Sequence, residues 1–494
     1  MLVLSILIIP LVFVLLIALM SSSQSKRIAL LGTLTTLGVS MYAFSQFLTD
    51  ANSINLIYKT TWIERLGANF HIQLDGINLI LVLLTTLLST FIVYSAYERE
   101  IKSPKTYFSL MLMMQSALLG VFLAKDALLF YIFWELTLIP IYLICLVFGG
   151  EGRQRITFKF FVFTMFGSLF MLLAILFLWL HNPAHTFAIA DFYKAGAALP
   201  ASQQVYVFIA FYLAFAIKIP IFPLHTWQPD TYVNAPTQGT MLLSGIMLKM
   251  GTYALIVWLI PTVPLGWKLA SKYVIIISII SVVYGSLMAL IQQNFKRLLA
   301  YSSLGHVGLI AAGIFSFNLQ GVQGALYQML SHGINVVALF FICDIIQQRM
   351  KTDNMQALGG IRNVSKLFGA FFIVATFASV ALPITNSFVG EFLLLHGIFQ
   401  YNSILAAVGC TTVILSAMYM LRAYQLMMHG ETNELTASFG KITMHEKIML
   451  GALAILILFF GVYPNLLLHI SEEPLKQLIE QVRHATLAVT YSKF

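Results

Sequence analysis

Fourteen mostly apolar stretches, each about 20 residues long, follow one another along this chain. A helix needs roughly 20 residues to cross about 30 Å of hydrocarbon, so each stretch is long enough to span a membrane. Hydrophobic residues make up 59% of the sequence and charged residues only 10%, and the mean hydropathy is +0.88. A soluble domain with an ordinary polar surface cannot be built from this composition. The sequence therefore predicts an all-α polytopic membrane protein with about 14 transmembrane helices.

The connections between these stretches are too short to hold a soluble domain. We place the spans at residues 2–20, 28–49, 76–97, 107–124, 126–148, 158–180, 204–223, 237–260, 272–291, 298–316, 322–346, 368–399, 403–428 and 444–468. The longest connections hold about two dozen residues, enough for hairpins or surface helices. Cys145, Cys343 and Cys410 lie far apart inside predicted spans, so we interpret them as core residues and not as metal or cluster ligands. We expect no cofactor in this chain.

The distribution of lysine and arginine predicts the orientation. Connections after odd-numbered spans, counted with the adjoining ends of the spans, carry 17 of these residues, whereas those after even-numbered spans, counted in the same way and with the C-terminal tail, carry 9. Cytoplasmic loops are enriched in positive charge, so this bias puts both termini on the outer face. The net charge of +9 follows from these loops and gives no reason to expect a nucleic-acid partner.

Three of the ionisable residues inside predicted spans stand in strongly apolar sequence. Lys218 is in AFYLAFAIKIPIF, Lys249 in LLSGIMLKMGTYAL and Glu135 in LFYIFWELTLIP. A charge at the centre of a bilayer costs a few kcal/mol on insertion scales, so such residues usually mark ion pathways. A lysine removed from water releases and regains a proton more readily, and a nearby carboxylate opposes that release. The alternative is a structural role, in which the lysines extend to the membrane–water interface or form static ion pairs.

Prolines predict that two of the spans are broken. Pro220 and Pro223 cannot donate backbone hydrogen bonds, which leaves the carbonyls of Ala216 and Ile219 without helical partners beside Lys218. Pro383 should likewise free the carbonyl of Ser379, and a polar run, Thr385-Asn386-Ser387, follows it. Broken helices are tolerated in a membrane where protein or water meets the exposed backbone, so both breaks are expected to line a hydrated path.

The breaks fall in the seventh and twelfth spans. Because these spans are five apart, an odd number, the two broken helices cross the membrane in opposite directions. This geometry suggests two inverted five-helix repeats, spans 4–8 and 9–13. We therefore divide the chain into residues 1–106 with the first three spans, 107–260 and 261–430 with the two repeats, and 431–494 with the last span and a tail.

The segment PLHTWQPDTYVNAPTQGTMLLSGIMLKMGTY, residues 223–253, resembles the signature of the antiporter-like membrane subunits. That family comprises three subunits of the proton-pumping NADH:quinone oxidoreductase, respiratory complex I, and the large subunits of multi-subunit cation/proton antiporters. Four further segments resemble its chain M type, the mitochondrial chain 4: FWELTLIPIYLI (133–144), KFFVFTMFGSLFML (159–172), LLAYSSLGHVG (298–308) and ALGGI (357–361). Chain M members carry a glutamate in the second broken helix, where chain N and the antiporter subunits usually carry a lysine. This sequence has Glu391. The sequence departs from the family's pattern in two places, at Gln228-Pro229-Asp230-Thr231 and at Gly239-Thr240. Neither departure changes Glu391 or the lysines and glutamate of the apolar spans.

The resemblance implies a role in proton transfer for six residues. Glu135 and Lys218 would be a modulating pair, Lys249 the central carrier, His306 and His332 links in a hydrated axis, and Glu391 the terminal site towards the outer face. His306 and His332 are equally consistent with neutral histidines hydrogen-bonded inside a helix bundle. We interpret His225 and Asp230 as groups that fix a loop, with proton uptake as the alternative, and Asp126 with Lys125 as the start of a helix.

The resemblance also implies partners and a location. NADH, FMN, iron–sulfur clusters and quinone would bind in partner subunits, and other membrane-arm subunits, including chains L and N, would be neighbours. A bacterial plasma membrane is favoured over an organellar one. Two other functions stay open at this point, the large subunit of a cation/proton antiporter and a passive scaffold; Glu391 disfavours the first and the buried lysines the second.

Overall fold

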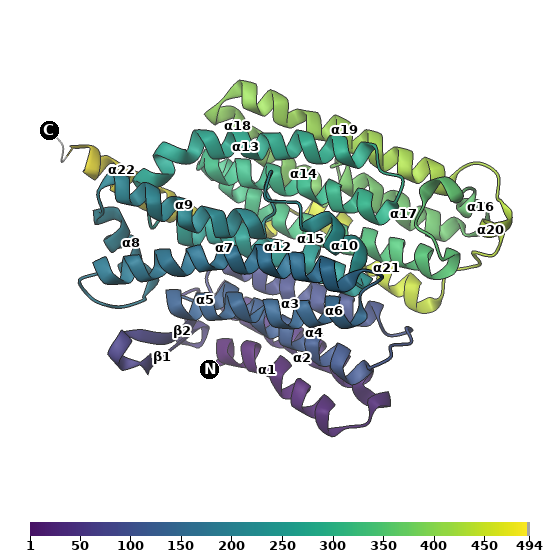
Figure 1. Cartoon of the computed structure of the whole chain (residues 1–494), viewed down its shortest axis with the longest axis horizontal. Coiled ribbons are helices and arrows are strands. Elements are labelled where there is room, and N and C mark those ends of the chain that lie inside the picture. The colour runs from purple at the N-terminus through teal and green to yellow at the C-terminus, as the bar shows by residue number, and fades with distance from the viewer. Residues whose placement is uncertain (492–494) are drawn as a thin grey trace.

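The computed structural model describes residues 1–491, and nearly all of them belong to a bundle of roughly parallel and antiparallel helices (Figure 1). Thirteen of its helical stretches are long and apolar enough to cross a membrane. A fourteenth crossing is made by two shorter helices in succession, Lys366–Ser379 and Asn386–Tyr401. The predicted number of spans is therefore confirmed, although several helices are longer than expected, and the ninth span begins at Pro264.

The first three spans form one edge of the bundle. They are α1 (Leu2–Leu19), α2 (Ser25–Thr49) and α3 (Asn78–Ser95). Between α2 and α3 lies an antiparallel hairpin of β1 (Ile57–Ile63) and β2 (Ala68–Gln73), one of the short hairpins that the connections allow. The hairpin contacts α1, so the N-terminal helix and the hairpin lie at the same face of the bundle.

The middle of the chain holds spans four to eight. Its helices are α4 (Pro104–Leu123), α5 (Ala127–Leu136), α6 (Leu138–Phe148), α7 (Arg153–His181), the short α8 (Ile189–Ala198), α9 (Ala201–Lys218), α10 (Gln228–Asn234), α11 (Thr237–Leu242) and α12 (Leu248–Ala254). The fifth span is divided between α5 and α6, where Pro140 has no N–H for the carbonyl of Leu136. Asp126 caps α5 by accepting from the backbone of Leu128 and Leu129, so its predicted place at a helix start is confirmed.

The second half of the chain adds spans nine to fourteen and a terminal helix. The elements are α13 (Pro264–Leu290), α14 (Phe295–Ser316), α15 (Leu319–Met350), α16 (Ile361–Val364), α17 (Lys366–Ser379), α18 (Asn386–Tyr401), α19 (Ser403–Met428), α20 (Glu434–Ala437), α21 (Met444–Val462) and α22 (Asn465–Tyr491). The segment expected as a tail is thus a 27-residue helix, α22, which packs on α13 and α15.

The centre of the bundle is made by α11–α12, α14 and α15. The most apolar stretches of the spans Thr237–Leu259 and Leu319–Met350 are entirely buried, and that of Phe295–Ser316 almost entirely. By contrast, only about a third of the corresponding stretch is buried in α1, α2, α19 and α21. A polar side chain on a central helix is therefore enclosed by protein and needs a partner there.

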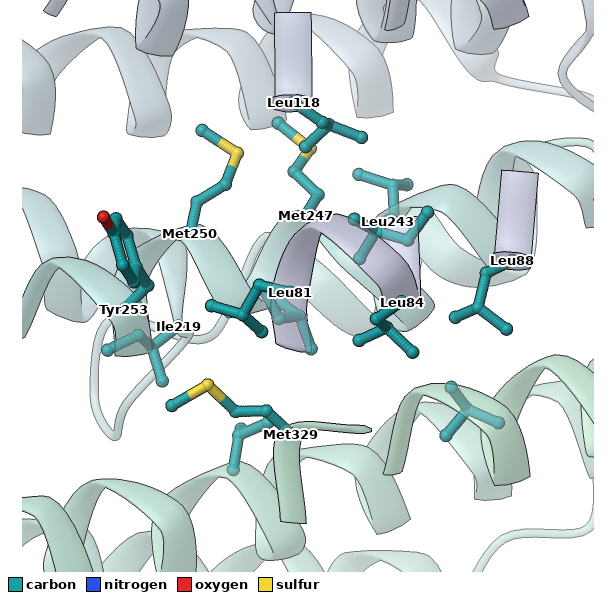
Figure 2. Packing of buried hydrophobic residues seen from close by; sticks show 14 of the residues in the cluster. Leu81, Leu84, Leu88, Leu118, Ile219, Leu243, Met247, Met250, Tyr253 and Met329 are labelled. Atoms are coloured by element: carbon teal, nitrogen blue, oxygen red, sulfur yellow. The ribbon is translucent and has the colours of Figure 1, made fainter. Parts of the chain in front are cut away.

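Figure 2 shows the apolar packing on one side of this centre, where Leu81 of α3, Met247 and Met250 of the eighth span, and Met329 of α15 gather into one cluster. Methionine has three rotatable bonds and fills irregular gaps between helices. The side of the eighth span that faces α3 and α4 is consequently closed by hydrocarbon.

The first predicted break is present, but one detail was wrong. Helix α9 ends at Lys218, and the chain turns through Pro220 and Pro223 before α10 begins at Gln228. The carbonyl of Ala216 does have a partner, because the N–H of Ile221 reaches it at 2.9 Å, one residue further along than in an α-helix. Indole Nε1 of Trp227 donates to the carbonyl of Ile217 at 3.0 Å. The carbonyls of Ala216 and Ile217 are thus both satisfied within the turn.

The second predicted break separates α17 from α18. Two residues in it have positive φ angles, Ala381 at 58° and Ile384 at 80°. A β-branched residue at such an angle is strained and is held there by its surroundings. Both breaks therefore occur where the prolines place them.

One expectation about the cysteines was wrong. Cys145 and Cys343 are buried, as expected for core residues, but Cys410 is exposed on α19. Helix α19 lies at the outside of the bundle, so an apolar position in its sequence faces the surroundings and not the core. No cluster of three or more His, Cys, Asp or Glu side chains suited to a metal occurs within residues 1–491.

Candidate functional site

Lys249 lies in one of the two spans whose most apolar stretch is entirely buried. Short π-helical segments, Leu243–Met247 and Leu255–Leu259, lie on both sides of α12, so the helix is continuous but not regular. Such π-bulges frequently occur at functional sites. The side chain of Lys249 is 1% exposed, and its Nζ donates to the carbonyl of Ser244 at 2.6 Å.

His332 of α15 is the second partner of Lys249. Nζ of Lys249 lies 2.8 Å from Nδ1 of His332, and Nε2 of the same ring lies 2.9 Å from the hydroxyl of Ser303 on α14. The Ser303 hydroxyl is in turn 3.2 Å from that of Ser244. Three central helices therefore meet in a closed ring of polar contacts. An imidazole with a lysine at one nitrogen and a hydroxyl at the other can pass a proton between them.

His306 and Glu391 form a second polar pair beside the first. Nδ1 of His306 on α14 lies 2.9 Å from Oε1 of Glu391 on α18, and both side chains are almost completely buried. The amide of Gln328 on α15 donates to the same carboxylate oxygen at 3.2 Å. The glutamate thus lies against polar groups from two helices, in the second turn of the helix that follows the second break.

A gap separates the two histidines. The ring centroids of His306 and His332 are 5.9 Å apart, which is too far for a direct hydrogen bond. Between the same helices lies a small cavity of about 10 Å³ that both histidines line together with Ser302, Gln328 and Asn335. This is about the space that one water molecule occupies, and the lining offers it several polar partners.

The second break is tied to this cavity. The amide of Asn335 donates to the hydroxyl of Ser387 at 2.8 Å, and the hydroxyl of Ser331 donates to the carbonyl of Asn386 at 3.1 Å. The polar run after Pro383 therefore faces α15. It supplies part of the polar lining that the sequence predicts for a broken helix.

Lys218 and Glu135 are near each other without touching. Nζ of Lys218 is buried without a hydrogen-bond partner among the described residues, and so is Oε1 of Glu135. No ion pair joins the two within that part of the chain. Nζ of Lys218 instead lies 5.4 Å from the ring centre of Trp134, the neighbour of Glu135, which is within range of a cation–π contact. The two polar groups are thus separated in this conformation.

Three ionisable residues near the span ends have structural partners. Asp230 pairs with Arg297 and lies 3.6 Å from Lys159, and Asp344 is fully buried against Arg99. The ring of His225 stacks near Phe222 and Tyr284. These contacts agree with loop-fixing roles for His225 and Asp230, and proton uptake through them stays a prediction.

A family model described as the transmembrane region of NADH:quinone oxidoreductase and Mrp antiporter subunits matches residues 124–416, more than half of the chain. The chain belongs to this family. Its sequence is of the subunit M, or chain 4, type. NADH-quinone oxidoreductase subunit M of Rickettsia prowazekii is 36% identical over 95% of this chain and 97% of its own length. The corresponding subunit of Rhodobacter capsulatus is 37% identical over 94% and 92%.

Solved structures agree with this family membership. A chain of respiratory complex I from Thermus thermophilus with bound NADH superposes with a TM-score of 0.89 at 30% identity, covering 98% of this chain and all of that one. A chain of the Mrp complex from Dietzia sp. superposes with a TM-score of 0.83 at 16% identity, covering 99% of this chain and 56% of that one. The second likeness shows a shared fold only.

The structure brings together four of the six residues singled out from the sequence of this family member: Lys249, His332, His306 and Glu391. Their polar neighbours were not singled out from the sequence. Gln328, Ser331 and Asn335 lie three or four residues apart around His332, so the four residues form one polar stripe on the buried helix α15. That spacing inside an apolar span was the signal that could have revealed them.

Proposed function

We propose that this chain is a proton-translocating membrane-arm subunit of an NADH:quinone oxidoreductase, and that protons pass along Lys249, His332, His306 and Glu391. The observation that carries the proposal is the pair of close contacts, 2.8 Å between Lys249 and His332 and 2.9 Å between His306 and Glu391, on either side of a cavity with room for about one water. Buried ionisable groups inside a membrane are costly and are usually functional.

The Lys249 end of this axis holds one proton that two groups share. When Lys249 is an ammonium, it donates to the unprotonated Nδ1 of His332, whose Nε2–H then donates to Ser303. Transfer to the ring makes the imidazole a cation and leaves a neutral amine. The ring would then give up its Nε2 proton, which turns from the Ser303 hydroxyl to a water between the histidines, and that water would carry the proton to His306.

The other end of the axis is the pair of His306 and Glu391. A proton arriving on the His306 ring stands 2.9 Å from the carboxylate, which accepts it. Protonated Glu391 then releases the proton towards the outer face. The two charges of the pair cancel when both groups are ionised, so the pair is stable until a second proton arrives.

Lys218 and Glu135 regulate the axis in this proposal. In the present conformation the carboxylate does not touch the ammonium, so it opposes loss of the lysine proton less than a direct ion pair would. Approach of the two groups would hold the proton on Lys218, and their separation would let it move on to Lys249. In this proposal the end of α9 moves at the break that Pro220 makes.

The energy for proton translocation would come from partner subunits. Moving one charge against a membrane potential costs about 2.3 kcal/mol per 100 mV, and we assign its source to quinone reduction in partner subunits, which would also hold NADH, FMN and the iron–sulfur clusters. The neighbours in the membrane arm would include the antiporter-like subunits L and N. The chain itself is a multi-pass membrane protein, and we propose that both of its termini lie on the outer face of a bacterial plasma membrane.

Lys249→Ala in the assembled complex tests the proposal. We expect proton pumping in reconstituted vesicles to fall by about 100-fold or more, the range that positioned acid–base groups contribute. Coupled quinone reduction should slow as well, while the subunit composition stays normal.

Lys268→Ala is the matched control, since it removes an exposed lysine of α13 outside the axis. It should leave pumping unchanged. Full pumping by Lys249→Ala with normal assembly would exclude Lys249 as a carrier.

A further inference from the structure

A second polar site lies far from the proton axis, between the start of α17 and the end of α19. It is a pocket of about 680 Å³ at the end of the bundle that also carries α16 and α20 (Figure 1). Its wall includes Arg362 of α16, Lys366 and Ile373 of α17, Tyr424 of α19 and the following His429. None of these residues belongs to the axis described above.

The mouth of this pocket is positively charged. Arg362 and Lys366 are exposed, and no aspartate or glutamate lines the pocket. Neither cation forms an ion pair or a hydrogen bond with another residue among positions 1–491, whereas Arg349 at the end of α15 pairs with Glu446 at 2.5 Å. The mouth of the pocket therefore carries two positive charges without a neutralising partner among the described residues, and the His429 ring lies beside them.

Another part of the pocket wall is apolar. Lys366, Ala370 and Ile373 lie at i, i+4 and i+7, so they share one face of α17 and run about 10 Å along the helix. Tyr424 and Met428 form the opposite wall at the same i, i+4 spacing on α19. The charged end is at the start of α17, and the apolar end points into the part of the helix that crosses the membrane.

We propose that this pocket binds an anionic phospholipid of the bilayer. Its phosphate would lie between Arg362 and Lys366, where a guanidinium and an ammonium donate charge-assisted hydrogen bonds. Its glycerol and acyl carbons would follow Ala370 and Ile373 along α17. Basic pockets at the membrane surface are suited to acidic headgroups, and each nearby lysine or arginine strengthens binding about fivefold.

A free phosphate shares the headgroup chemistry but does not fit the whole pocket. Inorganic phosphate would engage the two cations and leave the wall of Ala370, Ile373 and Met428 without a partner. A lipid uses both ends at once. The lipid is therefore the occupant that matches the pocket in charge and in polarity along its length.

Lipid binding by the purified complex tests this inference. The complex carrying Arg362→Gln with Lys366→Gln is depleted of lipid and then titrated with spin-labelled phosphatidylglycerol. We expect its affinity at one site per complex to fall about 25-fold relative to the unaltered complex, fivefold for each charge removed. Lys268→Gln with Lys272→Gln, which removes two exposed lysines of α13 outside the pocket, should leave that site unchanged.

Ala370→Trp separates the two possible ligands without changing a charge. The tryptophan fills the apolar wall, so phosphatidylglycerol should bind this variant more weakly. In the unaltered complex, inorganic phosphate should not compete with phosphatidylglycerol. Competition by millimolar phosphate, with no effect of Ala370→Trp, would identify a small-anion site and overturn the lipid assignment. Equal lipid binding in all variants would also overturn the lipid assignment. Release of a neighbouring subunit from either pocket variant, without loss of lipid, would overturn it as well.

Discussion

Nζ of Lys249 lies 2.8 Å from Nδ1 of His332, so the central lysine and a histidine of α15 share one proton site. Replacing His332 by leucine removes the acceptor and leaves Lys249 without a route towards His306. We expect His332→Leu to lower proton pumping by about 100-fold in reconstituted vesicles. His396→Leu, which changes an exposed histidine of α18, is the control and should pump normally.

The pair of His306 and Glu391 predicts a non-additive result. Because the two groups act in series, His306→Gln and Glu391→Gln should each reduce pumping, and the double variant should be no slower than the slower single one. Initial pumping rates of the four complexes give the comparison. Independent, multiplying losses would show that the two residues lie on different routes.

Substitution of Lys218 distinguishes a role in proton transfer from a structural role. The ammonium of Lys218 is buried without a hydrogen-bond partner in the described part of the chain, so Lys218→Met removes a costly polar group and roughly keeps the volume. We expect thermal stability of the subunit in the complex to be unchanged or higher, while pumping falls at least about tenfold. Lower stability with normal pumping would assign Lys218 a structural role.

The ion pair of Arg99 and Asp344 predicts a large loss of stability. Asp344 is fully buried and Arg99 largely so; Asp344→Ala would leave the guanidinium without its partner. Breaking a buried pair in this way typically costs about 3–5 kcal/mol. Urea unfolding in detergent would measure it. The exposed pair of Glu472 and Lys476 is the control, and Glu472→Gln should change little.

His71 in β2 predicts a pH dependence for the hairpin. Burial of its ring, with the charges of Lys59 and Lys125 nearby, lowers the pKa of His71 from 6.5 to about 4. Between these two values the unfolded hairpin binds a proton that the folded one does not, so stability is complete above pH 6.5 and falls as the pH drops towards 4. Hydrogen exchange of β1 and β2, corrected for intrinsic rates, should be faster at pH 5 than at pH 7.

His71→Gln is the matched variant for that measurement. Glutamine keeps a polar side chain and does not titrate, so its hairpin should show much less change between the two pH values. An unchanged pH response would mean that another group on the hairpin is responsible.

The spans were predictable because a bilayer imposes a length of about 20 residues on every crossing. The breaks were predictable because proline has no N–H, but the sequence did not show that Ile221 would satisfy the carbonyl of Ala216 through a wider turn. That outcome depends on the path of the chain after α9. The division into four segments and the inverted repeat stay predictions.

The candidate site was predictable as a set of residues but not as a set of contacts. Lys249 and Glu391 stand out because charge is rare in apolar spans. Their pairing with His332 and His306 depends on how α12, α14, α15 and α18 pack, which no local pattern gives. Likewise, the sequence places Glu135 in the fifth predicted span and Lys218 in the seventh, and only packing decides how far apart their polar atoms lie.

An electron cryomicroscopy map of the whole complex with resolved waters tests the continuity of the axis most directly. We predict an ordered water in the small cavity between His306 and His332, within hydrogen-bond distance of both rings. A well-resolved map in which apolar side chains fill that space, with no water between the two rings, would contradict a single route from Lys249 to Glu391.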